Sequence, residues 1–136
     1  REAKIISKIL ENCKKKSWIS FTCKNELEIS DGTLLAKCCN FLKKNPNIFA
    51  LGVNCTSPKY VTQLIKILKN NCGDKKIIIY PNSGKKYDSK NKSWVGKKNN
   101  SFDILLKEWI NLGVDILGGC CGIGPNQIKK ISKLIN

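Results

Sequence analysis

The sequence lacks long hydrophobic runs. No apolar stretch approaches the roughly 18 residues that a membrane-spanning helix requires, so we expect no segment that crosses a membrane. The chain also has no N-terminal methionine and no charged-then-apolar leader with a small-residue cleavage site. It opens on Arg1-Glu2-Ala3-Lys4, a run typical of the middle of a helix. We therefore expect the chain to be a piece of a longer protein.

Arginine and acidic residues are also scarce. The chain carries 25 basic against 10 acidic residues, for a formal net charge of +15, yet Arg1 is its only arginine. A strongly basic chain suits a polyanionic partner. Arginine, however, is the residue usually chosen for bidentate contacts to phosphates and bases. We therefore favour a solvated, lysine-rich surface, and a basic nucleic-acid-binding module stays as the less favoured alternative.

Cysteine, by contrast, is abundant, with eight residues in the chain. Such a number would suit a disulfide framework in a small secreted domain. The strand and helix pattern described next does not need such cross-links, and nothing in the sequence signals secretion. We predict reduced thiols in the cytoplasm, which leaves some of them free to bind a metal.

Short apolar segments alternate with amphipathic ones along the chain. We expect strands over residues 18–23, 48–53, 77–80 and 114–119 and helices over residues 3–10, 34–42, 58–68, 101–110 and 125–135. Ser57 and Ser101 are candidate N-caps. The polar stretch 82–100 is too long for a simple connection, so we expect a functional or mobile loop. Repeated βα units predict an α/β fold with a parallel sheet, either doubly wound or half of a (β/α)8 TIM barrel.

Three cysteines follow predicted strands. Cys55 comes after the second strand, and the pair Cys120-Cys121 comes after the fourth. Parallel α/β proteins place their active sites at the carboxyl ends of their strands, so we expect these thiols to converge. Three protein ligands with one open position are typical of a catalytic zinc site. Neighbouring strand residues point to opposite faces, but the glycines around the pair allow both thiols to turn towards one ion.

The other cysteines in or beside predicted helices have a simpler explanation. A lone buried cysteine usually acts as a small apolar residue. We apply that interpretation to Cys13, Cys38, Cys39 and Cys72. The pair Cys120-Cys121 taken alone could bind metal or serve redox chemistry, and Cys55 on the alternate strand favours metal.

Several motifs together resemble the homocysteine S-methyltransferase family, the zinc-dependent enzymes that do not use cobalamin as methyl carrier. The matching stretches are Trp18-Ile19-Ser20-Phe21-Thr22-Cys23-Lys24, Ser30-Asp31-Gly32, Gly52-Val53-Asn54-Cys55-Thr56, Tyr80-Pro81-Asn82-Ser83-Gly84 with Tyr87-Asp88, and Gly118-Gly119-Cys120-Cys121-Gly122. They occur in family order over nearly the whole chain. The first and fourth resemble the branch that uses S-methylmethionine or S-adenosylmethionine.

The resemblance implies a (β/α)8 barrel of about twice this length. Residues 1–136 would be a partial domain, the C-terminal half of that barrel. The first half of such enzymes supplies the acidic groups that hold the amino-acid end of homocysteine. We therefore expect an incomplete site that needs the N-terminal half-barrel or another copy as its partner.

The resemblance also implies a reaction. Zinc held by Cys55, Cys120 and Cys121 would activate the thiol of homocysteine, which would take a methyl group from a sulfonium donor to give methionine. Asn54, Asn82 and Ser83 would offer polar contacts to substrate at the rim, or only shape turns. The main alternative to a methyltransferase is a non-catalytic zinc-binding half-barrel fragment.

Overall fold

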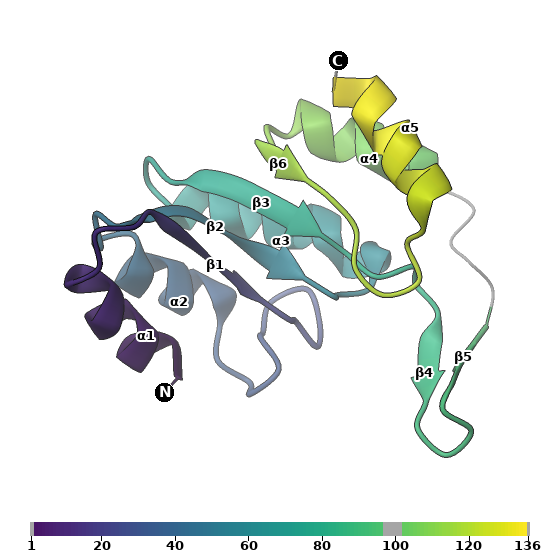
Figure 1. Cartoon of the computed structure of the whole chain (residues 1–136), viewed down its shortest axis with the longest axis horizontal. Coiled ribbons are helices and arrows are strands. Elements are labelled where there is room, and N and C mark those ends of the chain that lie inside the picture. The colour runs from purple at the N-terminus through teal and green to yellow at the C-terminus, as the bar shows by residue number, and fades with distance from the viewer. Residues whose placement is uncertain (1, 97–101, 136) are drawn as a thin grey trace.

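The computed structural model describes residues 2–96 and 102–135, and the chain alternates helices and strands over most of that length (Figure 1). In chain order the elements are α1 (Glu2–Glu11), β1 (Ser17–Phe21), α2 (Leu35–Leu42), β2 (Ile48–Asn54), α3 (Pro58–Asn71), β3 (Lys76–Tyr80), β4 (Lys86–Asp88), β5 (Ser93–Val95), α4 (Phe102–Asn111), β6 (Ile116–Leu117) and α5 (Pro125–Ile135). Within these residues, no helix has the length and apolar character needed to cross a membrane.

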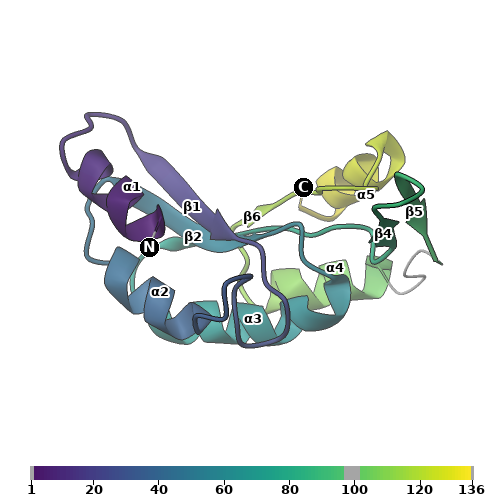
Figure 2. The same cartoon turned by 90° about the horizontal axis from the view of Figure 1, so that it is seen from below.

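One parallel sheet organises the described part of the chain. Its four strands lie in the order β1-β2-β3-β6, which is also their order along the sequence. Figure 2 shows the sheet as curved, with α2, α3 and α4 in a row along its convex face. Each of these helices connects two neighbouring strands, as in the βα units of a barrel. The prediction of an α/β fold with four βα units side by side is confirmed.

The hydrophobic core lies between the sheet and this row of helices. Leu51 and Val53 of β2 and Ile77 and Ile79 of β3 are buried on the helix-facing side. The helices supply most of the other core residues, including Leu35, Cys39, Leu42, Val61, Leu64, Ile65, Leu68, Phe102, Leu106 and Trp109. In α3 the buried positions repeat at helical spacing, so one stripe of the helix packs on the sheet. This core holds the carboxyl ends of the strands in fixed register.

The two outer strands each have a single sheet neighbour within the described residues. Beside β1, Trp18 is 52% exposed, and a cavity of about 630 Å³ lies between α1, β1 and α2. Ile6 of α1 lines this cavity and is partly exposed. Ile19 packs against the core and also lines this cavity, whereas Trp18 lies on the opposite face of β1 because neighbouring residues alternate across a strand.

The segment after β3 differs from the loop predicted over residues 82–100. Its described part contains an antiparallel pair, β4 and β5, in which Asp88 pairs with Ser93. The Asp88 carboxylate accepts hydrogen bonds from the backbone N–H groups of Lys90 and Asn91 and so closes the turn. Ser57 occupies the predicted N-cap position of α3 without a side-chain capping bond. The second predicted cap, Ser101, lies outside the described residues.

Candidate functional site

Cys55 lies one residue beyond the end of β2, where the regular strand conformation stops. Its φ is +45°, in the left-handed region that non-glycine residues seldom adopt. Its N–H donates to the carbonyl of Tyr80 at 3.0 Å, and its own carbonyl accepts a hydrogen bond from the Asn82 side chain at 3.0 Å. These two hydrogen bonds to the chain at the end of β3 stabilise the strained backbone of Cys55 and so fix the direction of its thiol.

The cysteine pair lies on the turn between β6 and α5. The Cys120 N–H donates to the carbonyl of Pro81 at 2.8 Å, which attaches the turn to the chain beyond β3. The turn reverses at Gly122, whose φ is +75°. At Gly119 a Cβ atom would come 2.2 Å from the Ile123 side chain, so the turn needs a glycine there as well. The flanking glycines therefore supply the backbone freedom that we predicted for this turn.

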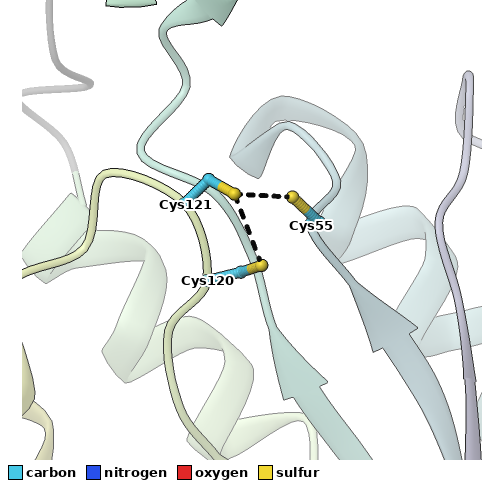
Figure 3. A group of neighbouring side chains, drawn as sticks. All are labelled: Cys55, Cys120 and Cys121. Carbon is cyan, nitrogen blue, oxygen red and sulfur yellow. Dashed lines mark hydrogen bonds between the residues drawn. The ribbon is translucent and has the colours of Figure 1, made fainter.

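The structure brings the three thiols together from two parts of the chain that lie far apart in sequence (Figure 3). The Cys121 sulfur lies 3.4 Å from the Cys55 sulfur and 3.9 Å from the Cys120 sulfur, and all three lie within 4.8 Å of one another. Zn–S bonds of about 2.3 Å in a tetrahedron place sulfurs about 3.8 Å apart. The three thiols thus fit a metal ion with little rearrangement. Among the described residues they form the one group of three or more potential ligands.

The surroundings of Cys55 favour its neutral thiol over the thiolate. Burial, together with hydrogen bonds to the neighbouring thiols of Cys120 and Cys121, raises the pKa of Cys55 to about 12. A thiol must lose its proton to become a good metal ligand. The cluster is therefore a set of sulfur ligands that a cation would deprotonate on binding.

The predicted substrate-contact residues lie beside the cluster but in different environments. Asn54 donates to the Thr22 hydroxyl at 3.2 Å and borders the cavity at the β1 edge. Asn82 uses both ends of its amide on the backbone, with Cys55 and with the N–H of Gly84. Ser83 is only 4% exposed, so it does not lie at the rim as we expected. Its contact with substrate, like those of Asn54 and Asn82, stays a prediction.

Thr56 has a role in positioning the site that was not predicted from the sequence. Thr56 is 1% exposed, and its hydroxyl accepts from the Cys23 N–H at 2.8 Å and donates to the Asn54 carbonyl at 2.9 Å. It therefore joins the ends of β1 and β2 directly beside Cys55. The sequence does not indicate this role, because the hydroxyl of Thr56 bonds to backbone groups, which every residue carries.

Cysteines outside the cluster behave as packing residues. Cys39 and Cys72 are buried between α2 and the end of α3. The pKa of Cys39 is raised by its hydrogen bond with Cys72 and by burial. Burial likewise raises the pKa of Cys38. The thiols of Cys38 and Cys39 therefore stay neutral and unreactive near pH 7.

Comparison with known protein sequences gives a consistent picture. Residues 1–135 match the family model described as homocysteine S-methyltransferase. The homocysteine S-methyltransferase YbgG of Bacillus subtilis is 41% identical over 133 residues, which are 96% of this chain and 42% of that protein. The selenocysteine Se-methyltransferase of Brassica oleracea var. italica is 33% identical over 138 residues, 97% of this chain and 39% of that protein. The chain thus spans about two fifths of the length of these relatives.

Solved structures show the same similarity. The metallated form of the homocysteine methyltransferase MmuM from Escherichia coli superposes with a TM-score of 0.78 at 26% identity, covering 97% of this chain and 40% of that one. The oxidized form of the same enzyme gives a TM-score of 0.77 at 25% identity, with 99% and 41% coverage. The fold of this chain therefore corresponds to part of a larger enzyme for which a metallated state is known.

Proposed function

Because the chain belongs to the homocysteine S-methyltransferase family, we propose that it serves the transfer of a methyl group from a sulfonium donor to the thiol of homocysteine, which forms methionine. The donor is S-methylmethionine or S-adenosylmethionine. Zinc is the metal, and Cys55, Cys120 and Cys121 are its ligands. The observation that carries the proposal is the convergence of these three thiols within 4.8 Å at the carboxyl edge of a parallel sheet.

The chemistry of the ligand set supports zinc. Soft thiolates select Zn²⁺ over hard cations such as Mg²⁺ and Ca²⁺, and the chain contains no histidine that would suit other transition metals. When bound, zinc would supply Lewis-acid activation that lets a substrate thiol lose its proton near neutral pH. Three protein thiolates more than balance the charge of the divalent ion and leave one position open for that substrate.

The chain's own residues would hold the thiols in place for this task. The Asn82 side chain donates a hydrogen bond to the carbonyl of Cys55, and the Thr56 hydroxyl links the ends of β1 and β2. The N–H of Ser83 donates to the carbonyl of Cys121 at 2.9 Å. Placement of this kind reduces the rearrangement that methyl transfer between two bound molecules would otherwise require. Asn54 lies where it would face a substrate that enters from the cavity at the β1 edge.

The second candidate is a non-catalytic zinc-binding half-barrel. It is favoured by the exposed side of β1 and by the coverage of about two fifths of the relatives' length. We propose that residues 1–136 are the C-terminal half of a barrel whose N-terminal half, or another copy, supplies the remaining substrate contacts. Every cysteine of the chain is unpaired, which supports a reducing compartment, and we propose the cytoplasm.

An assay of methyl transfer separates these two functions. The purified chain with zinc, homocysteine and each donor should give weak or no turnover, and the complete parent protein should give rapid formation of methionine. Cys121→Ala in the complete protein should abolish that turnover. Absence of turnover in the complete protein, with zinc bound, would leave the non-catalytic function.

A further inference from the structure

The hydroxyl of Ser83 is a buried polar group with no hydrogen-bond partner. Ser83 is 4% exposed, and its Oγ atom is the one buried side-chain nitrogen or oxygen without a partner in residues 2–96 and 102–135. Leaving a buried hydroxyl unpaired destabilises a protein. The fold therefore carries a cost at this position that no contact among these residues offsets.

The unpaired hydroxyl lies against the turn that bears the cysteine pair. The Ser83 N–H donates to the carbonyl of Cys121 at 2.9 Å. A Cβ atom at Gly122 would come 2.4 Å from Ser83 Oγ and 2.9 Å from Ser83 Cβ. Because Gly122 has no side chain, the turn can pack directly against the side chain of Ser83. The backbone of Ser83 already fastens the turn, so its hydroxyl is not needed for that purpose.

Burial also argues against a direct contact between Ser83 and substrate. A side chain that is 4% exposed under the Gly122 turn cannot meet an incoming molecule unless the turn moves away. What the hydroxyl lacks is a hydrogen-bond partner. The turn packed against it carries the thiols of Cys120 and Cys121, which become stronger acceptors once they lose their protons to a metal. A hydroxyl that donates to a thiolate forms a charge-assisted hydrogen bond, which is stronger than one between neutral groups.

We propose that Ser83 is a positioning residue that donates its hydroxyl hydrogen bond to a metal-bound thiolate of the Cys120-Cys121 pair. This inference rests on the proposed metal site and assigns a residue that acts on the metal through its ligands. Three thiolates on one divalent cation carry a net negative charge, and a donated hydrogen bond stabilises it. Partners of metal ligands typically change metal affinity by about 10- to 100-fold when they are removed.

The test compares Ser83→Ala with Ser7→Ala, which removes a second buried serine that is 3% exposed and far from the cluster in sequence. The Ser7 hydroxyl accepts a hydrogen bond from Asn45 at 3.1 Å, so it is satisfied. Zinc affinity is measured by competition with a chelator, and stability of the metal-free chain by urea unfolding. A third readout is the thiolate-to-metal charge-transfer band of the cobalt-substituted chain.

Ser83→Ala should weaken zinc binding by about 10- to 100-fold and leave the urea midpoint of the metal-free chain unchanged or higher, because no hydrogen bond is lost. Its charge-transfer band should move to lower energy, since the thiolate loses a hydrogen bond. Ser7→Ala should do the opposite, with a lower urea midpoint and unchanged zinc affinity.

Two results would overturn the inference while leaving the zinc site intact. One is wild-type zinc affinity and an unshifted cobalt band in Ser83→Ala. The other is loss of stability or folding of metal-free Ser83→Ala, which would assign its hydroxyl to the fold. If the wild-type chain binds no zinc at all, the proposed metal site itself fails and the inference fails with it.

Discussion

At the scale of single residues, the candidate site depends on the conformation of Cys55. A φ of +45° costs a non-glycine residue free energy, of the order of 1 kcal/mol or more. The bonds from Cys55 to Tyr80 and Asn82 offset that cost and direct the thiol towards Cys121. The backbone of the chain therefore arranges the ligand set, which lowers the cost of ordering it when a metal binds.

Each of the three clustered cysteines should be required for stoichiometric metal binding. Replacement of Cys55, Cys120 or Cys121 by alanine leaves two thiols, and zinc content measured after gel filtration should fall from about one ion per chain to near zero. Cys38→Ala is the matched control, because Cys38 is also partly exposed but lies on α2. Full zinc content in any of the three variants, or its loss in the control, would count against the assignment.

Metal affinity should rise steeply with pH. The pKa of Cys55 is raised to about 12, so this thiol is protonated near neutrality and must release its proton when it binds the ion. Each displaced proton makes the apparent affinity rise about tenfold per pH unit below the thiol pKa. Chelator competition between pH 6 and pH 8, corrected for the chelator's own protonation, measures this slope. A slope of zero would mean that the thiols do not hold the ion.

How far the sequence predicts the site differs from residue to residue. The convergence of the three cysteines follows from the parallel topology, because the carboxyl ends of all strands meet at one edge. The burial of Ser83 does not follow, since side-chain direction beyond a strand end depends on turn geometry and on contacts such as the one with Gly122. The left-handed conformation of Cys55 cannot be predicted either, because its hydrogen-bond partners lie in a distant part of the chain.

At the scale of elements, the pairing of β2 with β3 depends on a glycine. A Cβ atom at Gly52 would lie 1.7 Å from the carbonyl oxygen of Ile78, so Gly52→Ala must push the two strands apart. We expect a loss of at least about 3 kcal/mol in the free energy of unfolding. Gly118→Ala is the control, because its new Cβ would meet the Tyr80 Cβ at an ordinary 3.4 Å and should cost less than about 1 kcal/mol.

Urea unfolding of both variants measures the difference. Equal stability of Gly52→Ala and wild type would mean that the close approach of the strands at this position is not maintained in solution.

Buried elements are predicted better than exposed ones. The continuous apolar run of β2 and the apolar stripe of α3 predict these two elements clearly, because their apolar residues are buried in the core. The pair β4 and β5 was missed, since three-residue strands of mixed polarity produce no detectable period. In α5, Ile131 is buried, but Ile128 and Ile135 are exposed. A sequence stripe shows which face is apolar and cannot show whether a partner covers it.

At the scale of the whole molecule, the net charge of +15 tests the nucleic-acid alternative. If the lysines form only a solvated surface, binding to unrelated duplex DNA should be no tighter than about micromolar at physiological salt and should weaken steeply as salt rises. Fluorescence anisotropy with a labelled duplex provides the measurement. Nanomolar affinity at physiological salt would revive the nucleic-acid-binding function.

The central claim is that three thiolates hold one zinc ion and leave a position open for a substrate thiol. X-ray absorption at the zinc edge of the zinc-loaded chain tests it most directly. We predict three sulfur neighbours at about 2.3 Å and one lighter neighbour, with a fourth sulfur replacing the lighter one when homocysteine is added. Four sulfurs before any homocysteine is added, or fewer than three, would contradict the account.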